Sequence, residues 1–230
     1  MYTKKRKKVN KDTWVVMPTY NEELTIDIAI RDVLMHCKNL VVVDDGSTDK
    51  TYSIAFGSCY VLKQVINKGK GAALRMGIEF AISKGAKKII FIDADRQHEA
   101  TKIPQFIKEL DEKDIVFGFR NLTGQMPWKF RVGNYVLSQM INVLFKVRII
   151  DSQCGFRAIR AEVYDKIKWH SDRYSVETEM IVNTAKHKLS YTQVPIRTIY
   201  LDSQKGTTVM DGVKIMYDIL RFWWEEKSAK

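Results

Sequence analysis

Carboxylate side chains follow an apolar segment of the sequence at the point where we expect a buried β-strand to end. The segment is 89–92, and Asp93, Asp95 and Gln97 come after it. Hard divalent cations such as Mg²⁺ and Mn²⁺ prefer oxygen ligands, and proteins often hold them with one or two carboxylates plus substrate phosphates. These three residues are therefore candidates to hold a metal against a diphosphate. The competing interpretation is that Asp95 only begins the next helix.

Two further polar clusters have the same position relative to predicted strands. Residues 18–22 (PTYNE) follow the apolar run 13–17, and residues 44–47 (DDGS) follow the run 40–43. Each cluster alone is typical of a turn or a helix cap. If the strands are parallel, however, their carboxyl ends lie at one edge of the sheet, where open α/β sheets bind ligands. The three clusters together predict a ligand site at that edge.

The segments that position these clusters alternate between β-rich apolar runs and helical patterns, which predicts βαβ units and a parallel sheet. Asn21 can cap a helix that has Glu22 and Glu23 in its first turn. Further helices are expected at 70–84, 101–113, 128–146, 176–186 and 209–224. Strands or extended segments are expected at 13–17, 40–43, 59–65, 88–92, 114–118, 155–159 and 191–196.

The chain shows no internal repeat and no low-complexity linker, so we predict one α/β domain over residues 12–230. Its central sheet is expected to be mostly parallel and flanked by helices. Residues 1–11 are expected to form a basic tail, which contributes six of the net charges in a total of +11. Such a cluster of cations either attracts anionic lipid or nucleic acid, or is a solvated, disordered arm.

The composition excludes several classes of protein. Cys37, Cys59 and Cys154 are an odd set without a CxxC pair, which argues against a disulfide framework and a structural zinc site. We therefore expect a reduced, cytoplasmic compartment. No segment approaches the roughly 18 apolar residues of a membrane-spanning helix. A basic nucleic-acid-binding module is the alternative from another class, but no zinc-finger, RNP or helix-turn-helix signature supports it.

Four motifs in this order resemble a family 2 glycosyltransferase with the GT-A fold. They are PTYNE at 18–22, VVDDGSTD at 42–49, NKGKG at 67–71 and DAD at 93–95. The stretch DSQCGFRA at 151–158, together with Gln97-His98, resembles dolichyl-phosphate mannose synthases and related polyprenyl-phosphate hexosyltransferases. The similarity covers roughly residues 12–205, and it is less specific for the donor sugar than for the superfamily.

The resemblance implies roles for individual residues. Those implied to line the nucleotide pocket or to contact the base, ribose or diphosphate are Pro18, Tyr20, Glu22, Val43, Asp45, Asp93 and Ala94. Asp95 and Gln97 are implied to bind Mg²⁺ or Mn²⁺, with Asp95 also at the substrate. Arg197 and Lys205 are implied to close on the donor. Arg96 stands where the family has leucine, and it either contacts a phosphate or points outward.

The reaction that the resemblance implies is inverting transfer of a hexose from a nucleotide diphosphate sugar, with GDP-mannose favoured, to a dolichyl or polyprenyl monophosphate. Arg120 and Arg131 are candidates to hold the acceptor phosphate, and with Asp95 they form the expected catalytic set. An acceptor phosphate is already ionised, so no base is needed. The alternative is a soluble or polysaccharide hydroxyl acceptor, for which a carboxylate such as Asp151 would serve as base.

Several other polar residues keep two interpretations. Lys68 and Lys70 can cradle a phosphate with their neighbouring glycines, although the P-loop spacing is absent. Glu177 and Glu179 point in different directions on a helix, so either one of them faces the pocket or both lie in an exposed helix start. His98 is expected to be structural, because no second histidine lies at ligand spacing.

The last predicted helix carries an apolar stripe. Its members are Val213, Met216, Tyr217, Leu220 and Trp224, with Phe222 and Trp223 nearby. We expect the stripe to pack in the core, which is the common arrangement for such a pattern. The alternative is a lipid interface, which suits tryptophans near a chain end. For the protein as a whole we expect a cytoplasmic location with peripheral attachment to a membrane surface.

Overall fold

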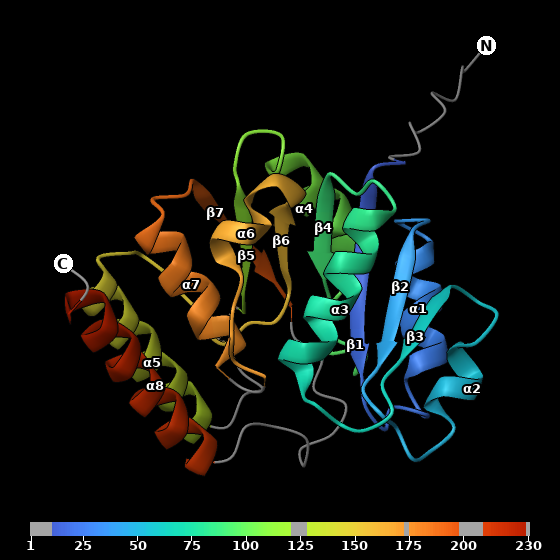
Figure 1. Ribbon diagram of the computed structural model, residues 1–230, viewed down its shortest axis with the longest axis horizontal. Helices are drawn as coiled ribbons and strands as arrows, with labels where there is room; N and C mark the ends of the chain where they lie inside the picture. Colours follow the sequence, from blue (N-terminus) through green and yellow to red (C-terminus); the bar gives the residue numbers. More distant parts are fainter. Residues whose placement is uncertain (1–10, 121–127, 173–174, 198–208, 229–230) are drawn as a thin grey trace.

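Seven strands form a sheet that carries helices on both faces (Figure 1). The computed structural model describes residues 11–120, 128–172, 175–197 and 209–228. The strands are β1 (Thr13–Thr19), β2 (Leu40–Asp44), β3 (Tyr60–Lys63), β4 (Lys88–Phe91), β5 (Ile115–Arg120), β6 (Arg157–Arg160) and β7 (Tyr191–Ile196). Their order is β3-β2-β1-β4-β6-β5-β7. Only β6 is antiparallel to its neighbours within this sheet, so the predicted α/β architecture with a mostly parallel sheet is confirmed.

The two faces of the sheet bury separate hydrophobic cores, because successive side chains of a strand point to opposite faces. In β1, Trp14 and Val16 belong to one core, and Val15 and Met17 belong to the other. The first core is covered by α3 (Lys70–Ser83), α5 (Trp128–Phe145), α6 (Tyr164–Ile167), α7 (Val176–Lys186) and α8 (Val209–Ser228). The second is covered by α1 (Ile26–Leu34), α2 (Thr51–Ala55) and α4 (Ile103–Glu109).

The strands that precede the three polar clusters end at one edge of the sheet. β1 is parallel to β2, with Thr19 opposite Asp44, and parallel to β4, with Val16 opposite Phe91. β4 and β5 are both antiparallel to β6, so the end of β5 and the start of β6 lie at this edge as well. The expectation of a shared edge is confirmed, and the edge also gains the residues around Arg157.

The loop after β1 differs from the prediction. β1 continues to Thr19, α1 begins only at Ile26, and Asn21 has a left-handed φ of 53°. Asn21 therefore caps no helix. Its side-chain oxygen accepts a hydrogen bond from the N–H of Thr48, and its own N–H donates to the hydroxyl of Ser47, both at 2.9 Å. Asn21 thus ties the β1 loop to the β2 loop, an arrangement that depends on the pairing of the two strands.

One predicted helix is shorter than expected, and two short helices were not predicted. The helix expected at 101–113 is a 3₁₀ turn at Ala100–Lys102 followed by α4, which ends at Glu109. The short helices α2 and α6 were not predicted, because four or five residues are too few to show a helical period. Of the predicted basic tail, residues 1–10 lie outside the described part of the chain.

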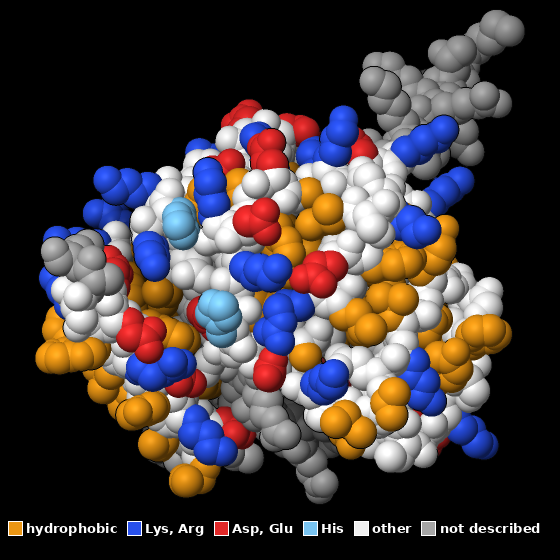
Figure 2. Space-filling view, viewed as in Figure 1, with side chains coloured by type: hydrophobic (Ala, Val, Ile, Leu, Met, Phe, Trp, Pro, Cys, Tyr) orange, Lys and Arg blue, Asp and Glu red, His pale blue; other side chains and the backbone are white. Residues whose placement is uncertain are grey.

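The apolar stripe of α8 lies at the surface, so the prediction that it packs in the core is wrong. Tyr217 and Trp224 are each 67% exposed. The apolar side chains that α8 buries are Ile215, Ile219 and Phe222, which lie on another side of the helix, towards α5 and α7. Because α8 is apolar on both sides, its own pattern does not decide which side is buried. Figure 2 shows hydrophobic side chains gathered at the lower left, over α8.

None of the helices in the described part of the chain combines the length and the apolar character needed to cross a membrane.

Candidate active site

Lys70, the first residue of α3, links the acidic loop after β4 to α7. Its Nζ lies 2.7 Å from Oδ1 of Asp93 and 2.9 Å from Oε1 of Glu177. Burial alone would lower the pKa of Lys70, but the two carboxylates raise it above its ordinary value. The pKa of Asp93 is lowered, against the effect of its burial, chiefly by Lys70. The charge of Asp93 is thus compensated inside the protein, and Lys70 contacts carboxylates in place of the phosphate considered for it.

The approach of Lys70 to Asp93 depends on a glycine in the loop before β6. A Cβ atom at Gly155 would lie 2.5 Å from Oδ2 of Asp93 and 2.6 Å from Nζ of Lys70. Real Cβ contacts of this length do not occur, so a side chain at this position would force one of the two charged groups to move. The glycine of the 151–158 motif therefore has a steric role beside the ion pair.

Asp95 and Gln97 follow in the same loop. Oδ1 of Asp95 accepts a hydrogen bond from the N–H of Gln97 at 2.9 Å, which bends the loop. Oδ2 of Asp95 has no hydrogen-bond or ion-pair partner among the described residues, and neither does the side-chain amide of Gln97. The loop therefore keeps a carboxylate oxygen and an amide oxygen available to a ligand.

This donor set fits a divalent cation. Burial, and then the negative charge of Asp93, raises the pKa of Asp95, and a bound cation would offset both effects. Within the described ranges no three His, Cys, Asp or Glu side chains converge so that they could hold a metal by themselves. The remaining ligands would therefore be the oxygen of Gln97, phosphate oxygens and water, which hard cations accept readily.

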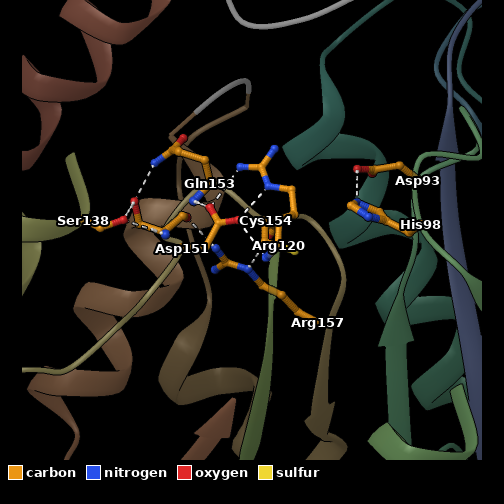
Figure 3. Close-up of polar contacts among 9 residues, drawn as sticks. Asp93, His98, Arg120, Ser138, Asp151, Gln153, Cys154 and Arg157 are labelled. Atoms are coloured by element: carbon orange, nitrogen blue, oxygen red, sulfur yellow. Dashed lines mark hydrogen bonds and ion pairs between the residues drawn. The ribbon is translucent and has the colours of Figure 1, made fainter. Parts of the chain in front are cut away.

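The side chains of the two residues that flank Gln97 contact other parts of the protein. Arg96 has a left-handed φ of 60°, and its Nε lies 3.9 Å from Oδ2 of Asp32 on α1. Arg96 therefore faces a carboxylate of a neighbouring helix, and the phosphate contact considered for it stays a prediction. His98 packs against the ring of Phe156 and places its Nε2 3.6 Å from Oδ2 of Asp93 (Figure 3).

Asp45, implied to contact the base or ribose, fixes the loop that leads into α3. Its Oδ1 accepts the N–H of Lys68, and its Oδ2 accepts the N–H of Gly69, both at 2.8 Å. The same two loops touch at Gly46, where a Cβ would lie 2.7 Å from the carbonyl carbon of Ile66. Asp45 thus helps to position Lys70, and its contact with a nucleotide stays a prediction.

The remaining residues implied at the nucleotide fall into two groups. Tyr20 is 44% exposed beyond the end of β1, and Glu22 accepts a hydrogen bond from the hydroxyl of Thr25 at 2.8 Å. Pro18, Val43 and Ala94 are buried. The side chains of this second group pack in the protein interior, and the contact with a nucleotide that is implied for them stays a prediction.

Arg120, at the end of β5, binds Asp151 with two parallel hydrogen bonds (Figure 3). Nε lies 2.6 Å from Oδ2 and Nη2 lies 2.9 Å from Oδ1. Burial alone would raise the pKa of Asp151, but Arg120 and two backbone N–H groups lower it below the ordinary value. A carboxylate with a lowered pKa is a weak base, so Asp151 is poorly suited to the role considered for it with a hydroxyl acceptor.

Arg157 holds the loop between α5 and β6 against α7, a role that the sequence did not reveal. Its guanidinium is fully buried and donates hydrogen bonds to the backbone carbonyls of Ser152, Cys154 and Glu177 at 2.8, 2.8 and 2.6 Å. It also lies 5.1 Å from the ring centre of Phe117. The available signal was an arginine that the period of β6 directs into the sheet interior.

Both glutamates at the start of α7 are buried, so the interpretation as an exposed helix start is wrong. Glu177 is 8% exposed and pairs with Lys70, as described above. Glu179 is 6% exposed and accepts hydrogen bonds from the N–H of His170 and from the N–H and hydroxyl of Ser171. Glu177 therefore belongs to the site, and Glu179 anchors the segment before it.

The three remaining basic residues predicted at the site are Arg131, Arg197 and Lys205, and the structure describes the first two. Arg131 is half-buried near the start of α5. Arg197 follows β7, which is parallel to β5 and ends at the same edge, and its N–H donates to the carboxylate of Glu99 at 3.2 Å. Lys205 lies outside the described residues. The roles implied for these three residues stay predictions.

Comparison with known proteins agrees with this geometry. A family model described as glycosyl transferase family 2 matches residues 14–168. The UDP-N-acetylglucosamine–dolichyl-phosphate N-acetylglucosaminyltransferase of Methanococcus voltae is 31% identical, over 90% of this chain and 94% of that protein. The polyprenol monophosphomannose synthase of Mycolicibacterium smegmatis is 27% identical, over 88% of this chain and 82% of that protein.

A similar fold occurs in a solved structure. The crystal structure of glucosyl-3-phosphoglycerate synthase from Mycobacterium tuberculosis, in complex with Mn²⁺ and UDP-glucose, superposes with a TM-score of 0.74. The two sequences are 20% identical, and the match covers 93% of this chain and 79% of the other. At this identity the likeness concerns the fold.

Proposed function

The chain belongs to glycosyl transferase family 2 and has the GT-A fold, and we propose that it transfers a hexose, with inversion, from a nucleotide diphosphate sugar to a polyprenyl or dolichyl monophosphate. The observation that supports this most is that two neighbouring carboxylates have different partners. Asp93 is paired with Lys70, whereas Asp95 has no ion-pair partner among the described residues. The site therefore has one carboxylate held by the protein and one ready for a ligand.

The donor would bind at the edge where β1, β2 and β4 end. We propose that Asp95 and Gln97 hold Mg²⁺ or Mn²⁺ there, since their oxygens suit a hard cation. Such a cation, when bound, neutralises the charge that develops on the leaving diphosphate. Lys70 keeps Asp93 in place beside it, and Gly155 leaves the space that this pair needs.

The acceptor would bind next to the end of β5. Transfer breaks the bond between the anomeric carbon and the diphosphate, and it forms a bond from that carbon to an oxygen of the acceptor phosphate. Arg120 and Arg131 are proposed to orient this phosphate, because cations fix phosphate oxygens in place. The phosphate carries no proton that must be removed, which agrees with the lowered pKa of Asp151. A phosphate acceptor is thus better supported than a hydroxyl acceptor.

The donor sugar is the least constrained part of the proposal. The sequence favours GDP-mannose, and one relative is named as a polyprenol monophosphomannose synthase. The M. voltae relative, at higher identity, is named for UDP-N-acetylglucosamine. We keep GDP-mannose as the predicted donor and treat UDP-N-acetylglucosamine as the competitor that the assay must include.

The proposal is tested by incubating the purified protein and Mg²⁺ with GDP-mannose, UDP-N-acetylglucosamine or UDP-glucose, each carrying a labelled sugar. The acceptor is a polyprenyl monophosphate, and the matched control is the same polyprenol without phosphate. We expect one donor to label the lipid phase, and only with the phosphorylated acceptor. Equal labelling of the free polyprenol, or none with any donor, would contradict the proposal.

A substitution at Gly155 tests the role of the Asp93–Lys70 pair. We expect Gly155→Ala to lower kcat/KM on the order of 100-fold, because the added Cβ displaces a charged group at the site and small displacements of catalytic groups are costly. The control is Gly212→Ala on α8, where a Cβ meets no atom within 4 Å. Both variants should remain folded by circular dichroism. Equal activities of the two variants would show that Gly155 has no such role.

A further inference from the structure

Two neighbouring helices expose an apolar surface that the proposed transfer reaction does not use. We define the α5–α8 face by six side chains: Tyr135, Val136 and Val143 of α5, and Tyr217, Leu220 and Trp224 of α8. Their exposed fractions range from 40% at Val136 to 74% at Val143. The two helices pack against each other, and four of the six side chains, Tyr135, Val136, Val143 and Leu220, line one groove. Tyr217 and Trp224 lie one helical turn on either side of Leu220, so they extend the same surface. Contiguous apolar surface of this kind marks an interaction site in a soluble domain.

A shallow groove of about 440 Å³ runs along this face. One wall is formed by α5 between Tyr135 and Leu144, and Leu220 of α8 forms the other. Among the described residues of its lining, Gln139 is the only one with a polar side chain apart from the tyrosine hydroxyl. The groove therefore offers hydrocarbon a recess but gives a polar ligand almost nothing to bind.

The charges around the face favour an anionic partner. The sequence from residue 121 to residue 150, which includes all of α5, contains no aspartate or glutamate and four basic residues. Two of these, Lys146 and Arg148, are exposed just beyond the end of α5. α8 itself carries three basic and four acidic residues, and its Arg221 is paired with Asp218 and Glu225, so the positive charge beside the face comes from the α5 segment. Exposed cations next to an apolar face attract anionic lipid headgroups.

We propose that the α5–α8 face is a membrane-docking surface, which lies in the headgroup region of an anionic phospholipid bilayer. Tyr135, Tyr217 and Trp224 are amphipathic aromatics, which prefer the membrane–water boundary. A second copy of the chain fits less well, because the acid-free α5 segments of two copies would bring like charges together. The surface deepens the proposed function: α5 begins eight residues after Arg120, so the bilayer that dissolves a polyprenyl chain lies beside the proposed phosphate site.

The test is sedimentation of the full chain with vesicles of phosphatidylcholine containing phosphatidylglycerol, and with vesicles of phosphatidylcholine alone. We expect binding to the anionic vesicles, and we expect Tyr217→Glu/Trp224→Glu to lower the partition coefficient by about tenfold or more, since it removes apolar contact and adds negative charge. The matched control is Met35→Glu/Phe56→Glu, which places the same charges at residues 72% and 68% exposed on the other face of the sheet. It should bind as the unchanged protein does. The basic segment at residues 4–8 is common to all variants, so its contribution cancels.

The inference is overturned if the unchanged protein does not bind the anionic vesicles, or if both double variants bind them equally. It is also overturned if the protein is a dimer in analytical ultracentrifugation, and Tyr217→Glu/Trp224→Glu dissociates this dimer without changing vesicle binding. Donor-induced thermal stabilisation is measured in parallel and should be the same in both double variants, because neither touches the sheet edge. Vesicle binding without sugar transfer would contradict the proposed function but support the docking surface. Sugar transfer without vesicle binding would support the proposed function but contradict the docking surface.

Discussion

Asp95→Asn is expected to reduce sugar transfer by about 100-fold or more, a loss comparable to the removal of one preorganised charge-stabilising group from an active site. The reason lies in the different surroundings of two carboxylates. Asp93 is neutralised by Lys70, whereas Asp95 offers Oδ2 to a ligand. Asparagine keeps the size of the side chain and an oxygen, but it removes the charge that a divalent cation requires.

The same variant is expected to keep, or slightly raise, the melting temperature of the protein without ligands. Burial and the charge of Asp93 raise the pKa of Asp95, which means that the ionised carboxylate is less favourable in the folded protein than in the unfolded chain. A neutral side chain removes this cost. Activity should therefore fall without any fall in stability, which a general disruption of the fold cannot produce.

Thermal unfolding with and without Mg²⁺ and a nucleotide diphosphate sugar separates these effects. A ligand that binds only the folded protein raises the melting temperature, and we expect Asp95→Asn to lose the part of this rise that depends on Mg²⁺. The control is Asp165→Asn, which neutralises an exposed carboxylate on α6. If the metal-dependent rise persists in Asp95→Asn, then Asp95 is not a metal ligand.

Arg157→Met is expected to lower the free energy of unfolding by about 3 kcal/mol, because three buried carbonyl groups lose the hydrogen bonds that the guanidinium donates. For a chain of this size the corresponding fall in melting temperature is about 6–12 °C. Methionine fills a similar volume, so the loss reflects the missing hydrogen bonds and charge more than a cavity. Urea unfolding of both proteins measures the difference.

Arg160→Met is the matched control for Arg157→Met. Arg160 lies in the same strand and donates to the carbonyls of Leu110 and Asp111, but it is partly exposed, so water can replace its hydrogen bonds. We expect a loss of about 1 kcal/mol for this variant. Equal losses in the two variants would show that burial does not increase the contribution of the Arg157 hydrogen bonds to the free energy of unfolding.

The buried arginine and the site are connected through the backbone. Arg157 donates hydrogen bonds to the carbonyls of Cys154 and Glu177. Cys154 directly precedes Gly155, which lies against Asp93 and Lys70, and the side chain of Glu177 pairs with Lys70. A guanidinium at this position thus fixes the glycine that the ion pair needs and the carboxylate that completes it. Partial loss of its hydrogen bonds should therefore lower activity as well as stability.

The sequence by itself determined the elements and the edge at which the chemistry lies. The bounds of α7 and β7 agree with the prediction, and α3 and α5 differ from it by one residue at the end. These elements are set by periods of two and 3.6 residues, which are properties of adjacent residues and can be read locally. The carboxylates at the ends of β1, β2 and β4 meet because parallel strands place their carboxyl ends together, which is a general rule of such sheets.

Only the tertiary structure decided which polar groups meet within that edge. Lys70 pairs with Asp93 across 23 positions of sequence, and Arg120 pairs with Asp151 across 31. The first pair depends on the packing of α3 over β1, next to β4, and the second depends on the antiparallel strand β6 beside β5. The burial of Glu177 and the exposure of Trp224 have the same origin, because each depends on which side of its helix another helix covers. A sequence records what a side chain can do, whereas its partner and its dielectric surroundings are set by residues that are distant along the chain.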